Sequence, residues 1–125
     1  MRELGFTMNL KREWMNMEPS KRDWKLFREK IGTWQETYME KLVGEYVELL
    51  NDGVPASSKF WALEKRIKQD KKKPGVILEV RKQQMVDDII RLLGDGVITM
   101  DDLLEFSDEL RDNIKSLQER MNDEI

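Results

Sequence analysis

The sequence predicts an all-α protein: a small helical bundle with a long N-terminal helix, a short basic helix and a C-terminal αα-hairpin. Apolar residues recur at steps of three and four along most of the chain, which is the helical period, and strand-like alternation is scarce. Charged residues make up 38% of the 125 residues, so the apolar side chains are confined to stripes on amphipathic helices.

The first long helix is expected over residues 21–50. Ser20 supplies an N-cap, because its side chain can accept a hydrogen bond from an otherwise unpaired backbone amide. An apolar stripe then runs from Trp24 to Leu49 in steps of three or four. Residues 1–19 are expected to form an N-terminal arm that carries a short helix near residues 9–17, and residues 20–125 to form a single helical domain.

This helix is too long for the domain. Thirty residues span roughly 45 Å of helix, whereas a compact chain of this size has a radius of gyration of only about 14 Å. The helix must therefore bend, for which Gly32 is the natural place, or protrude. If it is straight, we expect its outer end to pack on a second copy of the protein.

The next helix is expected to begin between Pro55 and Ser58 and to end at Asp70, with Phe60 and Trp61 as core anchors. Residues 71–75 contain Pro74 and form a connection, because proline disfavours helical geometry in the residue before it.

Two further helices are expected over residues 76–93 and 100–121, joined by a short turn into an antiparallel hairpin. Thr99 and Asp102 have the spacing of a capping box at the start of the second helix. Ile98 is expected to anchor the turn to the core.

Composition excludes several functions. The chain has no cysteine and no histidine, which excludes Ser-His-Asp and Cys-His catalysis, disulfides and the usual zinc sites. The longest aliphatic run, Val76 to Leu78, is far shorter than the about 20 residues of a membrane span. We therefore expect a soluble cytoplasmic protein that has no membrane segment, is not an enzyme and needs no cofactor or metal.

Charge is uneven along the chain. Residues 52–83 carry 9 basic and 4 acidic groups, and residues 84–125 carry 4 and 12. These two regions either face each other within the fold or form separate binding surfaces. The basic region could bind phosphate backbones while an aromatic side chain stacks on a base. The candidate nucleic-acid contacts are Lys59, Lys65, Arg66, Lys68, Lys71, Lys72, Lys73, Arg81 and Lys82.

The acidic region contains six carboxylates between Asp101 and Asp112 that could hold a metal or act as acid and base. Most of them lie off the apolar stripe of the predicted helix, whereas metal-binding bundles direct carboxylates inward. We therefore favour an acidic helix that pairs with a basic partner or mimics nucleic acid.

Four tryptophans are many for a small acidic protein, and tryptophan is common both in cores and in interface hot spots. Trp24 and Trp34 share the stripe of the long helix, which favours the core, whereas Trp14 precedes the regular helices. The candidate protein-interface residues are Trp14, Trp34, Tyr38 and Trp61.

Four separated motifs resemble a group of short proteins from Gram-positive bacteria that are found near mobile elements and often carry the label "multidrug transporter". The motifs are DWKLFREKI (23–31), WQETYM (34–39), KFWALEKRI (59–67) and LEFSDEL (104–110). The resemblance implies an accessory role in a mobile element, as an inhibitor or adaptor that acts on a host protein. It brings no catalytic residues, and the absence of a long apolar run contradicts the transporter label.

The sequence thus favours a non-enzymatic protein-protein interaction module that binds a protein partner or a second copy of itself. The alternative is a nucleic-acid-binding accessory or regulatory protein that uses residues 59–82.

Overall fold

The computed structural model describes residues 18–123 and confirms the all-α fold. In chain order the elements are α2 (Lys21–Leu50), α3 (Ala56–Asp70), the 3-10 helix η1 (Lys82–Gln84), α4 (Met85–Gly94), the 3-10 helix η2 (Met100–Leu103) and α5 (Asp108–Asp123). The predicted helix near residues 9–17 and Trp14 lie outside the described residues.

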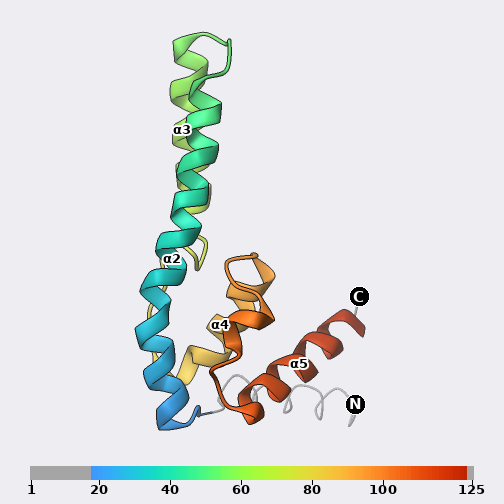
Figure 1. Ribbon diagram of the computed structural model, residues 1–125. Coiled ribbons are helices and arrows are strands. Elements are labelled where there is room, and N and C mark those ends of the chain that lie inside the picture. The colour runs from blue at the N-terminus through green and yellow to red at the C-terminus, as the bar shows by residue number, and fades with distance from the viewer. Residues whose placement is uncertain (1–17, 124–125) are drawn as a thin grey trace.

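The long helix α2 protrudes from the rest of the chain. Its length predicted that it would either bend or protrude. It runs without interruption through Gly32 from its N-cap Ser20, whose Oγ accepts a hydrogen bond from the amide of Asp23 at 3.1 Å. Its second half projects with α3 lying antiparallel beside it (Figure 1). We call this projecting part, residues 39–70, the α2–α3 hairpin.

The hydrophobic core lies at the other end of the molecule, where the first half of α2 meets α4, η2 and α5 (Figure 1). We call this part the body. Trp24 and Trp34 are partly buried and pack against the core, as their positions on the stripe predict. The core side chains are Phe27, Ile31, Met85, Val86, Ile89, Leu92, Ile98, Leu103, Phe106, Leu110, Ile114 and Leu117.

The helix predicted over residues 76–93 is shorter than expected, because α4 begins only at Met85. Residues 71–81 instead form an irregular segment that returns from the hairpin to the body along α2 (Figure 1). Gln35 Nε2 donates to the carbonyl of Pro74 at 3.0 Å, and Gly75 is so close to α2 that an added Cβ would lie 2.4 Å from Tyr38 Cδ2. These contacts hold the segment extended against α2.

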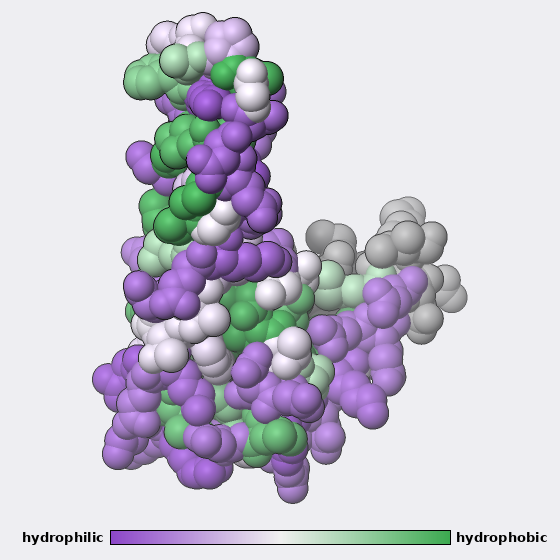
Figure 2. All heavy atoms as spheres, turned by 45° about the horizontal axis from the view of Figure 1, so that its top comes forward, coloured by the Kyte–Doolittle hydropathy of each residue, from purple (hydrophilic) through white to green (hydrophobic). Residues whose placement is uncertain are grey.

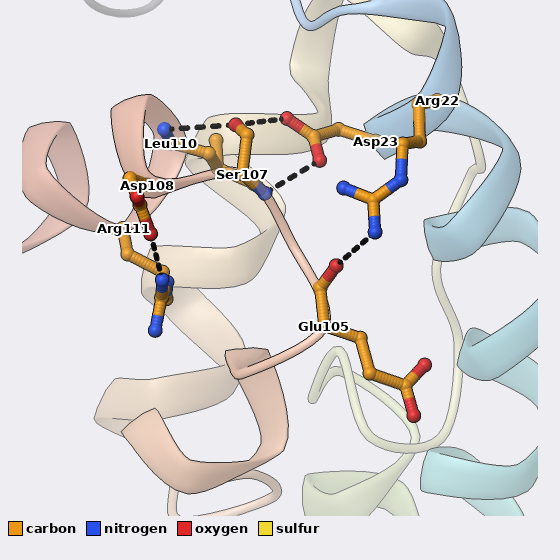
Figure 3. Close-up of polar contacts among 7 residues, drawn as sticks. All are labelled: Arg22, Asp23, Glu105, Ser107, Asp108, Leu110 and Arg111. Carbon is orange, nitrogen blue, oxygen red and sulfur yellow. Dashed lines mark hydrogen bonds and ion pairs between the residues drawn. The ribbon is translucent and has the colours of Figure 1, made fainter.

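The helix predicted over residues 100–121 is also wrong in its bounds, because it is divided into η2 and α5. Ser107 caps α5, since its Oγ accepts from the amide of Leu110 at 3.2 Å. The buried carboxylate of Asp23 accepts from both the amide and the hydroxyl of Ser107, at 2.9 and 2.6 Å (Figure 3). The break therefore lets one side chain of α2 hold the start of α5.

The turn between α4 and η2 agrees with the sequence. Gly96 adopts φ 73°, and the amides of Gly96 and Val97 bond the carbonyls of Leu93 and Leu92, which is the Schellman arrangement at a helix end. The capping box of Thr99 and Asp102 is present. Ile98 is buried, as expected of an anchor.

Candidate protein-interaction surface

The α2–α3 hairpin exposes large apolar side chains. Phe60 and Trp61 are 63% and 64% exposed, so the expectation that they anchor the core is wrong. Their rings pack edge to face with centroids 5.0 Å apart. The exposed apolar residues of the hairpin are Val43, Val47, Leu50, Val54, Phe60 and Trp61.

These side chains are exposed because α2 is apolar over a wider face than α3 covers. Residues 39, 42, 46 and 49 follow one stripe, and residues 43, 47 and 50 follow a second stripe at steps of four and three. Two adjacent stripes suit a helix with two neighbours, whereas α3 is the only helix beside the outer half of α2 in the described part of the chain. The second stripe is the sequence signal by which this surface could have been found.

Two hollows on the hairpin share Ile67 and Lys71, and we call them together the apolar groove. The first, of about 250 Å³, lies between the helices and includes Val43 and Tyr46. The second, of about 320 Å³, lies along α3 toward Phe60. Figure 2 shows hydrophobic side chains along the hairpin beside hydrophilic ones.

The two edges of the groove carry opposite charges. Helical periodicity places Glu40 beside the exposed stripe of α2. Lys68 and Lys71 line the groove on α3. Glu40, Lys68 and Lys71 are exposed, and of these three only Lys68 forms an ion pair, with Glu64 at 2.8 Å.

A polar network joins the two helices of the hairpin at the level of Asp70, the buried residue of α3. The Tyr46 hydroxyl donates to Asp70, Arg66 Nε lies 3.3 Å from Asp70 Oδ2, and Lys73 Nζ lies 3.2 Å from Oδ1. Arg66 also contacts Glu45 on α2 at 3.3 Å.

The network fixes the protonation states of its members. Burial opposes the charge on Asp70, but the hydrogen bonds from Tyr46 and Lys73 and the charge of Arg66 outweigh it, so the pKa of this carboxyl is lowered. Burial, the hydrogen bond to Asp70 and its negative charge raise the pKa of Tyr46 to about 12. A carboxylate and a neutral phenol therefore set the register of the hairpin at neutral pH.

The candidate nucleic-acid contacts are divided by this arrangement. Arg66, Lys68, Lys73 and Arg81 form ion pairs with acids of residues 45–79. Within residues 18–123, the other five basic side chains form no ion pair, and no ion pair joins the basic region 52–83 to the acidic region 84–125. These five are Lys59, Lys65, Lys71, Lys72 and Lys82.

The candidate interface residues lie in different environments. Trp61 is exposed on the hairpin, whereas Tyr38 is 8% exposed because Gly75 covers its ring. Trp34 is partly buried, with its ring centroid 6.2 Å from those of Phe27 and Phe106. Tyr38 and Trp34 thus pack within the chain, and Trp61 is the described candidate that faces solvent.

Three of the six acidic residues between Asp101 and Asp112 have structural partners. Asp102 belongs to the capping box, Glu105 pairs with Lys30 at 3.0 Å, and Asp108 pairs with Arg111 (Figure 3). Among residues 18–123 no three acidic side chains are grouped so that they could hold a metal ion.

Asp88 is a further buried acid, in the first turn of α4. It is 1% exposed, its Oδ2 has no hydrogen-bond partner, and Arg91 Nη1 lies 3.9 Å from its Oδ1. Burial, helped by the charge of Asp87 and partly offset by Arg91, raises the pKa of Asp88 to about 6.

No protein-family model, curated protein sequence or solved structure matches the chain. No helix of residues 18–123 is long and apolar enough to cross a membrane.

Proposed function

We propose that the protein is a non-enzymatic protein-protein interaction module that binds a protein partner through the apolar groove of the α2–α3 hairpin. The observation that carries this proposal is the exposed second stripe of α2 beside Phe60 and Trp61, on a hairpin that has almost no core of its own. Contiguous exposed apolar surface of this kind marks interaction sites, and tryptophan is enriched in interface hot spots.

The chemistry of the groove favours binding over catalysis. The acids that line it already have partners, since Asp70 contacts Tyr46, Arg66 and Lys73, and Glu64 contacts Lys68. The groove therefore offers apolar area and shape with charged edges. The resemblance to proteins found near mobile elements supports a role as a mobile-element accessory protein, either an adaptor or an inhibitor.

The test is site-specific photo-crosslinking in the cells that make the protein. A photoreactive benzoylphenylalanine replaces Trp61 on the hairpin in one variant and Leu104, which is 62% exposed on the body, in the control. We expect position 61 to give a protein adduct of defined mass that disappears when Val47→Lys is added. Absence of an adduct at position 61, or an equal one from position 104, would contradict the proposal.

Nucleic-acid binding is the second candidate, favoured by the exposure of Phe60 and Trp61 near unpaired lysines. It predicts that Lys71→Glu with Lys72→Glu abolishes a salt-sensitive affinity for a short DNA duplex, measured by fluorescence anisotropy. Lys21→Glu with Lys25→Glu, on the exposed start of α2, is the matched control. An affinity that is absent at low salt, or unchanged in the first variant, removes this candidate.

A further inference from the structure

We propose that the partner in the groove is a second copy of this chain, and that two α2–α3 hairpins form an antiparallel four-helix bundle. This inference rests on the proposed function, since it names the partner of the same groove. In the bundle α2 of each copy packs against α3 of the other, and the two-fold axis runs along the hairpins, so that the two bodies lie at the same end.

Charge complementarity selects this arrangement. Each copy presents an acidic side chain, Glu40, at the α2 edge and two basic side chains, Lys68 and Lys71, at the α3 edge. A two-fold interface uses the same patch twice, so a patch with one edge of each sign complements itself when acidic edge meets basic edge. The larger segments agree, because residues 36–50 contain four glutamates and one lysine, whereas residues 56–73 contain seven basic and two acidic residues.

The apolar residues fit the same arrangement. With the axis along the hairpins, α2 and α3 of different copies lie antiparallel with their tips together, like α2 and α3 within one copy. Val47 and Leu50 of one copy then reach the level of Phe60 and Trp61 of the other. Every helix has antiparallel neighbours, which is the usual arrangement of up-down bundles. A two-fold axis across the hairpins would instead place α2 on α2 and bring the acidic edges together.

The exposed aromatic side chains of the hairpin supply part of the area that a stable dimer needs. Phe60 and Trp61, which are 63% and 64% exposed, would bury roughly 400 to 600 Å² from the two copies together. The aliphatic residues of the second stripe add to this area, toward the roughly 1,200 to 2,000 Å² of stable interfaces.

The experiment is a charge exchange followed by light scattering on a size-exclusion column. Variant A carries Glu40→Lys, and variant B carries Lys68→Glu and Lys71→Glu. We expect the unchanged protein to elute as a dimer of 14.9 kDa chains. We expect each variant alone to dimerise roughly tenfold to a hundredfold more weakly, because the two-fold axis repeats every like-charge contact.

Mixing the two variants provides the decisive measurement. In an A–B pair both contacts between α2 and α3 again join opposite charges, so a heterodimer should form that neither variant forms with itself. Restored assembly also shows that both variants fold. An unchanged protein that stays monomeric at every attainable concentration, or a mixture that stays monomeric, would overturn the inference.

This outcome is separate from the proposed function. A crosslinked adduct at position 61 with the mass of two chains supports both proposals. An adduct of another mass, together with a monomer on the column, keeps the groove as a docking site and rejects self-association.

Discussion

The body and the α2–α3 hairpin are built from similar amphipathic helices, but they use them differently. In the body four segments share one core, and side chains such as Ile89 and Leu103 are fully buried. In the hairpin two helices face each other alone, the buried residue of α3 is the aspartate Asp70, and Phe60 and Trp61 face solvent. An apolar stripe therefore indicates that a helix face needs covering, but not which element or which chain covers it.

The largest difference should appear when isoleucine is truncated in each part. Ile89→Ala removes a fully buried side chain and should lower the free energy of unfolding by about 2 to 5 kcal/mol. Ile67→Ala, in the partly buried isoleucine of the hairpin, should cost about 1 kcal/mol or less in the monomer. Urea unfolding at a low protein concentration, which favours the monomer, measures both free energies. Equal costs would mean that the hairpin shares the body's core.

Residues 71–81 connect the hairpin to the body, and a substitution there should have the next largest effect on stability. In Gly75→Ala the new Cβ would lie 2.4 Å from Tyr38 Cδ2 and 2.8 Å from Val97 Cγ2, both of them ring or side-chain atoms of packed residues. We expect a loss of about 1 to 3 kcal/mol, since overpacking forces neighbouring side chains to move. Gly53→Ala is the control, because its Cβ would meet nothing within 4 Å. Thermal unfolding of both variants makes the comparison, and an equal effect would contradict it.

The buried Asp88 makes the stability of the body depend on pH. Its pKa is raised from 3.8 to about 6, so the folded state binds more protons than the unfolded state between these values. Stability should therefore fall as pH rises through this window and stay lower above it. Asp88→Asn should remove this slope and stabilise the protein by about 1 to 2 kcal/mol at pH 7. Denaturant unfolding at pH 4.5 and pH 7 tests this, and Asp112→Asn, which replaces an exposed carboxylate on α5, is the control.

The smallest expected effect is a gain in stability from a substitution on α2. Gly32 lies within an uninterrupted helix and its added Cβ would meet nothing within 4 Å. Gly32→Ala should therefore stabilise the protein by about 0.5 to 1 kcal/mol. Gly44→Ala, equally open but on the hairpin, should give a similar gain in the monomer. A loss of stability in Gly32→Ala, measured by thermal unfolding, would mean that α2 needs the glycine to bend.

Local signals in the sequence correctly predicted much of the fold. Ser20 as an N-cap, the capping box of Thr99 and Asp102, and the stripe of α2 all act within one or two helical turns, so the sequence contains the whole interaction. The errors lie where contacts with segments distant in the sequence determine the local conformation. Residues 76–81 continue an apolar pattern but are irregular because Gln35 and Tyr38 hold Pro74 and Gly75 against α2. The break before α5 depends on Asp23, 84 residues away from Ser107.

The candidate surface could be predicted only in part. Trp61 was a sequence-based candidate and is exposed, with its ring packed on Phe60 of the groove, but Tyr38 was expected at an interface and is buried. The exposed aliphatic stripe that includes Val43 and Val47 was missed. It runs beside the core stripe of α2, so in the sequence the two stripes resemble one broad apolar face. Its exposure follows from the projection of α2, which periodicity alone does not reveal.

The bond between Asp23 and Ser107 also has a consequence for biosynthesis. It closes a loop that contains the whole hairpin, and the core needs residues of α5 as far as Leu117. Contacts between neighbouring segments form at lower entropic cost than this closure. Because the ribosome releases the chain from its N-terminus, the hairpin can assemble while the last helix is still being synthesised. A nascent chain would therefore display the apolar groove before its body is complete.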